Sequence, residues 1–197
     1  MKRLKMLGAA MVCLAALMAT GGGTAYATEA TCNGSLCAVG TVIHGVSEGK
    51  VVLHPPFGSI ECDGTAEGKV SSAGSATTTP VGIATLSSLT NCNATVQVLA
   101  QGTGEIHTAG ASSNGDGTAT SSGTRVTIVY LGFHCIFETN KTDVGVLTGS
   151  NNTKGKATGD ISATIPRVGG TSGAFCGSTA AMTGSVVINT PGNIVIH

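Results

Sequence analysis

The residues that come closest to a known catalytic motif are Gly45-Val46-Ser47-Glu48-Gly49, which match G-x-S-x-G. In hydrolases this motif holds a nucleophilic serine on a sharp turn between a strand and a helix. Here the motif lies between two strand-like runs, and Lys50-Val51-Val52 follows it directly, so no helix starts after the serine. We therefore interpret the segment as a hairpin turn and predict no catalytic role for Ser47.

Acidic and histidine side chains offer two other chemistries. Glu61, Asp63 and Glu67 cluster in the sequence, and paired carboxylates can hydrolyse glycosides. Sugar subsites usually need aromatic platforms, however, and this chain has few aromatic residues, so we interpret the three acids as solvated strand-edge residues. Glu105 and His107 would point to the same side of a strand and could share a metal ion, but two ligands fall short of a site.

A third motif is weaker still. Asn114-Gly115-Asp116-Gly117 resembles a fragment of a calcium loop, but the terminal glutamate and the repeated acids of that loop are missing. Ordinary turn chemistry explains the four residues better. We therefore predict no catalytic, cofactor-binding or metal-binding residue, and no cofactor.

Composition narrows the classes of function. The chain has 197 residues, of which 30 are glycine, 10% are charged and 3% are aromatic, and it has no tryptophan. Average proteins carry about 25% charged residues. A formal net charge of zero argues against electrostatic binding to nucleic acid or to anionic lipid. The hydrophobic fraction of 41% is ordinary, so the composition does not indicate disorder.

Residues 1–27 have the pattern of a secretory signal peptide. A basic start is followed by an apolar run of about 14 residues, which is too short to cross the hydrocarbon core of a membrane. Ala25 and Ala27 fit the small-residue rule for cleavage. The remainder, residues 28–197, has seven basic and ten acidic residues, hence a net charge of −3, and no second stretch long enough to span a membrane. We predict a secreted protein, extracellular or at the cell surface.

Six cysteines remain after the signal peptide, and an even number in an exported chain indicates disulfides. Zinc is the rival interpretation, but the chain has no C-x-x-C pair and no H-x-x-x-H pair. Six cysteines allow fifteen pairings. The most economical is sequential: Cys32–Cys37, Cys62–Cys92 and Cys135–Cys176.

The region after the signal peptide reads almost entirely as strands. Short β-branched runs recur between Gly, Ser, Asn and Asp, as in residues 125–130 and 185–188, and no segment keeps a helical period for ten positions. Residues 111–123 and 151–153 look like hairpin tips. We predict one all-β domain over residues 28–197, an antiparallel sandwich or barrel of about ten short strands stapled by disulfides.

A possible pseudo-repeat divides this domain into two halves. In each half a cysteine leads through a Gly-rich hairpin to a β-rich segment and then to a second cysteine. The β-rich segments are GIATL (82–86) and DISATI (160–165). Shared Ser, Thr and Gly composition is the alternative explanation for this likeness.

The order of several short motifs resembles a family of signal-peptide-bearing proteins exported by soil actinobacteria, which has no established activity. The motifs include FGSIEC (57–62), LTNC (89–92), GFHCIF (132–137) and FCGSTAAMTGSVVI (175–188). The chain departs from the family at Gly177, where a proline is usual, and at Met182, where an aromatic residue is usual. The resemblance implies export, an all-β fold and the sequential cysteine pairing, and it implies no catalytic residue.

Two functional classes stay open. The first is a non-enzymatic protein that is secreted or associated with the cell envelope and serves as a surface, matrix or binding module. The alternative is a secreted hydrolase with an unrecognised site. The lack of a coherent acid, base and nucleophile favours the first class. Thr-rich strands with few charges are also poorly protected against edge pairing, so self-association is a further possibility.

We expect signal peptidase to cleave after Ala27, because small side chains occupy the two positions that the peptidase reads. N-terminal sequencing of the secreted protein should therefore begin at Thr28. A full-length chain held in the membrane would contradict the predicted localisation.

Overall fold

The computed structural model describes residues 28–72, 74–75, 81–84, 86–108, 116–150, 155–170 and 173–196. The predicted signal peptide and the hairpin tip expected at residues 151–153 lie outside this part of the chain, as do residues 111–115 of the other expected tip and residue 85 of GIATL.

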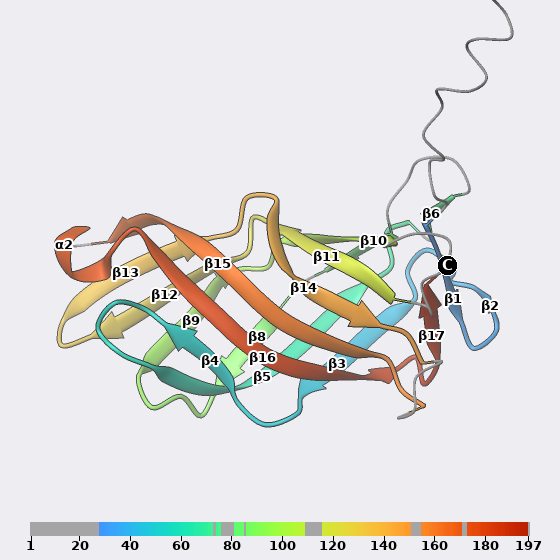
Figure 1. Ribbon diagram of the computed structural model, residues 1–197, viewed down its shortest axis with the longest axis horizontal. Helices are drawn as coiled ribbons and strands as arrows, with labels where there is room; N and C mark the ends of the chain where they lie inside the picture. Colours follow the sequence, from blue (N-terminus) through green and yellow to red (C-terminus); the bar gives the residue numbers. More distant parts are fainter. Residues whose placement is uncertain are drawn as a thin grey trace, which may run out of the picture.

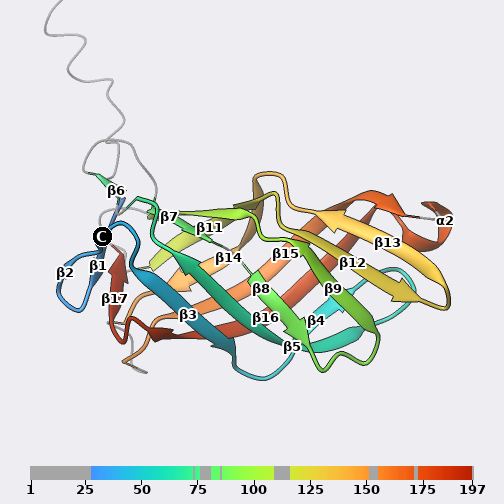
Figure 2. The ribbon, with the colours of Figure 1, turned by 180° about the vertical axis from the view of Figure 1, so that it is seen from behind.

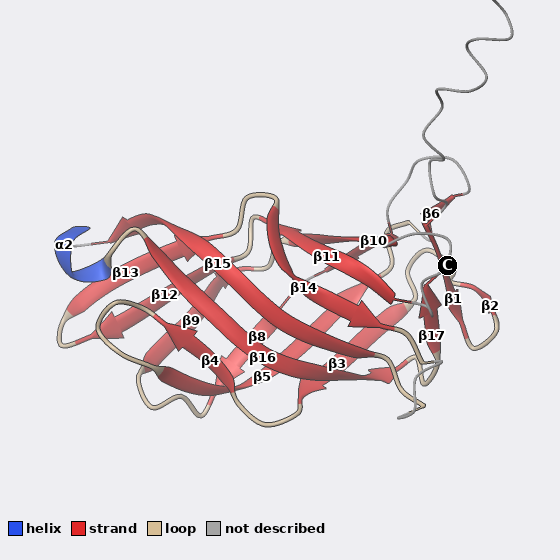
Figure 3. Cartoon of the chain, in the orientation of Figure 1, coloured by secondary structure: helices blue, strands red, loops and turns tan. Residues whose placement is uncertain are grey.

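Strands make up nearly all of the described chain, and Figure 3 shows them running from one end of the molecule to the other. The elements are β1 (Thr28–Cys32), β2 (Ser35–Leu36), β3 (Val42–Ser47), β4 (Val51–His54), β5 (Ile60–Lys69), β6 (Gly74–Ser75), β7 (Val81–Ala84), β8 (Leu86–Thr90), β9 (Thr95–Ala100), β10 (Thr103–Thr108), β11 (Asp116–Ser122), β12 (Arg125–Tyr130), β13 (Phe133–Glu138), β14 (Thr142–Thr148), β15 (Thr158–Gly170), α2 (Gly173–Cys176), β16 (Thr179–Thr190) and β17 (Ile194–Ile196).

The predicted antiparallel all-β class is confirmed, although the strands are more numerous than the ten or so expected. Three of them are also long: β15 has 13 residues, β16 has 12 and β5 has 10. Glycines within β15 and β16 made these segments look like several short strands in the sequence. Both strands are nevertheless continuous, because β15 and β16 pair without a break from Thr158↔Val187 to Pro166↔Thr179.

β15 and β16, paired along their length, form the spine of a large sheet. β3 and β4 lie end to end between β5 and β16, and each pairs with both. On the other side of the spine, the start of β15 pairs with β14 and its end pairs with β13. The sheet therefore divides into one half that continues through β14, β11 and β10, and another that continues through β13, β12 and β9.

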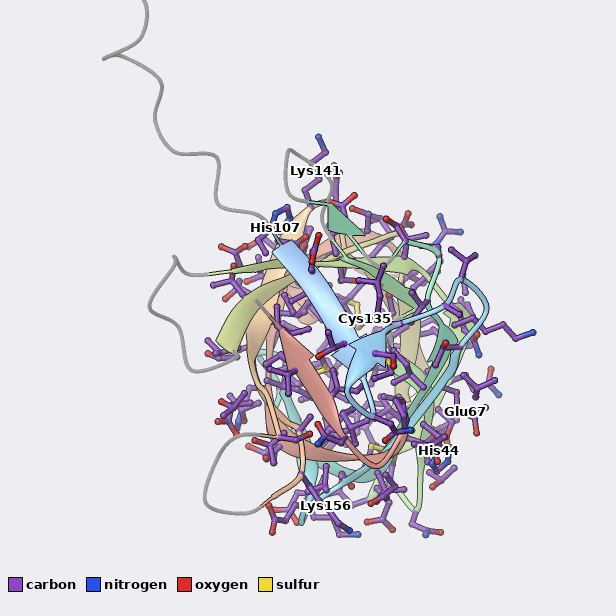
Figure 4. All side chains as sticks on the ribbon, turned by 90° about the vertical axis from the view of Figure 1, so that its right-hand side faces the viewer. His44, Glu67, His107, Cys135, Lys141 and Lys156 are labelled. Atoms are coloured by element: carbon purple, nitrogen blue, oxygen red, sulfur yellow. A yellow bond between two sulfur atoms is a disulfide. The ribbon has the colours of Figure 1, made fainter. Side chains whose placement is uncertain are left out.

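The sheet curls because β7 and β8 join its two margins. β7 pairs with β10, whereas β8, next along the chain, pairs with β5 on the far side of the spine. The strands consequently surround a common interior, as the end-on view shows (Figure 4). β17, β1 and β2 form a small separate sheet at one end, to which β6 pairs through β1 (Figure 1).

The interior holds two apolar clusters, one at each end of the long axis. The cluster at the α2 end contains Val51, Leu53, Ile128, Phe137 and Ile165, among others. The cluster at the β1 and β17 end is made of aliphatic residues, cysteine and alanine, such as Ile43, Ile106, Leu147, Val186 and Ile196. Figures 1 and 2 show that β15, β16 and β5 run past both ends and so connect the two clusters.

The three predicted disulfides, Cys32–Cys37, Cys62–Cys92 and Cys135–Cys176, are confirmed. Cys62, Cys135 and Cys176 are fully buried in the apolar cluster at the α2 end. Each of the two longer links lies within one of the predicted halves, and whether those halves arose by duplication stays a prediction. Within the described part of the chain, no helix is long and apolar enough to cross a membrane.

Removing the Cys135–Cys176 bond should cost more stability than removing Cys32–Cys37. The first closes a loop of 41 residues and the second a loop of 5. The chain-entropy relation gives about 4 and about 2 kcal/mol respectively. Denaturant unfolding of the Cys135→Ala/Cys176→Ala and Cys32→Ala/Cys37→Ala double variants measures both. Equal losses would contradict the assignment of Cys135–Cys176 as the stronger staple.

Candidate functional site

The serine of the G-x-S-x-G motif has a structural contact. Ser47 ends β3, and two residues of bend separate it from the segment that leads into β4, so the motif lies between strands as expected. The Ser47 hydroxyl accepts a hydrogen bond of 3.0 Å from the backbone N–H of Gly64. This contact fixes β3 against β5 and leaves the hydroxyl oriented by the sheet itself.

Two of the three acids of β5 are paired with neighbours on the outer surface, Asp63 with Lys50 and Glu67 with His44. The Asp63 carboxylate accepts hydrogen bonds from Lys50 Nζ at 2.7 Å and from Asn91 Nδ2 at 2.9 Å. The hydrogen bond from Lys50, followed by that from Asn91, holds the pKa of Asp63 below its usual value of 3.8. A carboxylate that is kept ionised in this way is a poor general acid.

The two histidine–glutamate pairs lie on different sides of the molecule. His107 Nε2 is 3.5 Å from Glu105 Oε2, and His44 Nε2 is 3.5 Å from Glu67 Oε1. Figure 4 shows His107 well apart from the neighbouring His44 and Glu67. Among the described residues no three His, Cys, Asp or Glu side chains gather as a metal site would require.

The arrangement closest to a hydrolytic site is a surface groove lined by His44, Glu67 and Ser71. His44 lies opposite Glu67 in the β3–β5 ladder. Ser71 comes four residues after Glu67, which is roughly 13 Å along an extended strand. That separation is far beyond the reach of a hydrogen bond between a nucleophile and its base.

Aromatic side chains gather instead at one end of the molecule. Phe175 stacks on Phe57 with ring centroids 4.8 Å apart and on Phe133 with centroids 4.4 Å apart. Tyr130 stacks on Phe57 at 5.1 Å. These four, together with Leu131, form what we call the aromatic tip, and they include four of the five aromatic residues of residues 28–197.

Three segments build the tip: the loop between β4 and β5, the β12–β13 hairpin and the short helix α2 (Figure 1). The Cys135–Cys176 disulfide ties α2 to β13. Gly177, with φ of +67°, lies so close to Pro56 that an added Cβ would collide with the proline ring. Phe57 and Phe175 pack on the apolar cluster beneath, so the inner part of the tip closes the end of the core.

The outer part of the tip projects into solvent. Leu131 is 78% exposed, Tyr130 38% and Phe133 36%. Leu131 and Gly132 form a two-residue turn with φ values of +49° and +83°. Such a turn favours Asn-Gly, and the β1–β2 hairpin of this protein uses Asn33-Gly34 with nearly the same φ values. An exposed leucine therefore occupies a position where local conformation favours asparagine.

Few polar groups accompany the tip. The segments that carry it, residues 55–59, 130–134 and 173–178, contain no acid, amide, lysine or arginine, and His134 is their one histidine. Polar residues outside these segments flank them: the Arg167 backbone N–H donates to Ser178 O, His54 Nδ1 lies 3.0 Å from Ser59 Oγ, and Asn93 Nδ2 lies 3.5 Å from Ser59 O. The exposed part of the tip is therefore largely apolar, and Tyr130 carries the one aromatic hydroxyl in it.

The sequence does not reveal this site, because the number of aromatic residues does not indicate where the fold places them. One signal was available: Tyr130-Leu131-Gly132-Phe133 sets a leucine into a turn between two strongly β-branched or aromatic runs. The contribution of Phe57 and Phe175 could not be seen, since only the fold brings them to the hairpin.

Comparison of the chain with protein-family models, curated proteins and solved structures found no match. The resemblance to exported actinobacterial proteins accordingly stays a prediction. Interpretation of the site therefore depends on its own geometry and chemistry.

Ser47→Ala should destabilise the protein by about 1 kcal/mol, because the partly buried Gly64 N–H loses its acceptor. Ser35→Ala, at an exposed strand position, should leave the free energy of unfolding nearly unchanged. Denaturant unfolding compares the two. A hydrolytic activity that Ser47→Ala abolishes without loss of stability would contradict the structural role.

Proposed function

We propose that this chain is a secreted or cell-envelope-associated, non-enzymatic protein that attaches to a lipid surface through its aromatic tip. The observation that carries the proposal is Leu131, an exposed leucine in a turn with positive φ. A residue other than Gly, Asn or Asp in this conformation costs roughly 1–2 kcal/mol. Strain kept at an exposed apolar position supports a role outside the fold.

The chemistry of the tip favours lipid over sugar. Aromatic sugar-binding sites need hydrogen-bonding side chains around their platforms. The tip segments contain no acid or amide, and the flanking His54 and Asn93 are engaged by Ser59. Tyrosine and phenylalanine beside a protruding leucine suit a membrane interface instead, where an apolar body enters and a polar edge stays wet.

The size of the tip favours lipid over a second copy of the chain. A stable protein interface buries about 1,200–2,000 Å² in total. The tip offers the end of one hairpin with three outward side chains, Tyr130, Leu131 and Phe133, which is far from that area. A small convex end can enter a fluid lipid layer, which adapts to its shape.

The charge of the protein indicates which kind of lipid surface it would bind. Residues 28–197 have a net charge of −3, and the tip segments contain no lysine or arginine. Attraction to anionic headgroups is therefore absent, and attachment depends on apolar burial. Burying the exposed parts of Leu131 (78%) and Phe133 (36%) would contribute roughly 2–3 kcal/mol, which supports weak and reversible attachment.

The proposal includes export of the protein from the cytoplasm. The signal-peptide pattern of residues 1–27 and the three disulfides both support an oxidising compartment outside the cytoplasm. The resemblance to exported actinobacterial proteins supports the same setting.

Leu131→Asn should weaken co-sedimentation with neutral phosphatidylcholine vesicles about tenfold, since it removes roughly 1–2 kcal/mol of apolar burial. The same change should keep or raise the thermal midpoint, because asparagine tolerates positive φ. Loss of attachment without loss of stability separates a docking role from a structural one.

Leu36→Asn is the matched control. Leu36 is 57% exposed in β2, at the end of the molecule opposite the tip (Figure 1), and its replacement should leave vesicle binding unchanged. Failure of the unaltered protein to bind neutral vesicles would overturn the proposal, as would binding that needs anionic lipid and disappears with salt.

A further inference from the structure

A cavity that the proposed attachment does not use lies inside the sheet, lined by residues of both apolar clusters. Its volume is about 180 Å³, and its walls come from β10, β11, β14, β15 and β16, with β3 and β5 completing the ring. Leu147, Ile161, Val186 and Ile188 are among the side chains that line it. For comparison, an apolar cavity of about 150 Å³ is large enough to hold benzene.

A glycine leaves part of this space open. Gly159 on β15 lies opposite Leu147 on one side and Val186 on the other, and directly paired residues share a face of the sheet. Both partners are buried and line the cavity, so a side chain at position 159 would also point inward. An added Cβ there would meet no described atom within 4 Å.

The cavity walls carry little charge. Glu67 and Glu105 belong to strands in the wall, but their carboxylates pair with His44 and His107 on exposed positions outside. Asp160 is exposed as well, on the outer face of β15. No carboxylate among these lining residues is therefore available to a ligand inside, which disfavours a charged ligand.

Three buried hydroxyl groups form the polar part of the wall. Ser121 Oγ lies 3.0 Å from Thr124 Oγ1 and 2.9 Å from Thr139 Oγ1. Two backbone N–H groups donate into the same cluster, Thr124 N–H to Thr139 Oγ1 and Gly102 N–H to Thr124 Oγ1. All three hydroxyl residues are buried and line the cavity. Hydroxyls rotate, so such a cluster can meet one hydrogen-bonding group of a ligand.

We propose that this cavity is a binding site for a small uncharged molecule, largely apolar, of roughly six to ten non-hydrogen atoms and carrying at most one hydroxyl or carbonyl group. The apolar part lies among Leu147, Ile161 and Ile188, and the polar group faces the hydroxyl cluster of Ser121, Thr124 and Thr139. Small-molecule sites combine the same features, an apolar concave lining and a few convergent polar groups.

Methyl NMR of the purified protein, with its three disulfides formed, tests this with benzene and 1-hexanol as probes. Both should cause saturable shifts of the Leu147, Ile161 and Ile188 methyl signals. Gly159→Leu fills the open space and should abolish the shifts, whereas Ser162→Leu, which adds the same group on the exposed face of β15, should preserve them. Gly159→Ala, a smaller filling, should weaken binding by an intermediate factor.

Ser121→Ala tests the polar end, since it should weaken 1-hexanol at least threefold more than benzene. The absence of saturable shifts in the unaltered protein would overturn the proposal, whether or not Gly159→Leu folds. Shifts that persist in folded Gly159→Leu or Gly159→Ala at full strength would also overturn it. Leu131→Asn should leave both probes bound, so failure of lipid attachment and failure of this site are separate results.

Discussion

The unbroken antiparallel pairing of β15 with β16 is the interaction on which the rest of the structure depends. Its ladder runs from Thr158↔Val187 to Pro166↔Thr179, past both apolar clusters. β3 and β4 attach to one side of this pair, and β14 and β13 to the other. Both the aromatic tip and the cavity are therefore fixed to one continuous frame, although separate strands complete the walls of each.

The sequence predicted the class of fold and the cysteine pairs for physical reasons that are local. β-branched runs between turn residues indicate strands wherever they occur, and the sequential pairing follows from short loops. The length of β15 and β16 was not predictable in the same way, because Gly159, Gly169 and Gly184 look like breaks in a strand. Pairing across the ladder overrides that preference, and only the fold reveals which strands are neighbours.

The side chains of the candidate catalytic motifs make structural contacts within the sheet. Ser47 is bonded to the backbone of Gly64, and Asp63 is paired with Lys50 and Asn91. These partners are 13 to 28 residues away in the chain, so no local pattern could have indicated them. The aromatic tip was not predictable from the sequence for the same reason, since Phe57 and Phe175 reach the hairpin from distant segments.

The distribution of aromatic side chains distinguishes the two ends of the molecule. Only five aromatic residues are present in residues 28–197, and four of them form the tip, with Phe137 in the core beneath. The opposite end must then fill its interior with aliphatic side chains, alanine and glycine, which have less volume to offer. Space remains beside Gly159, where an added Cβ would meet no described atom within 4 Å. The large aromatic side chains are thus concentrated at one exposed end, whereas the cavity is lined by aliphatic side chains of both clusters, among them Ile165 and Met182 from the α2 end and Leu147 and Ile188 from the other.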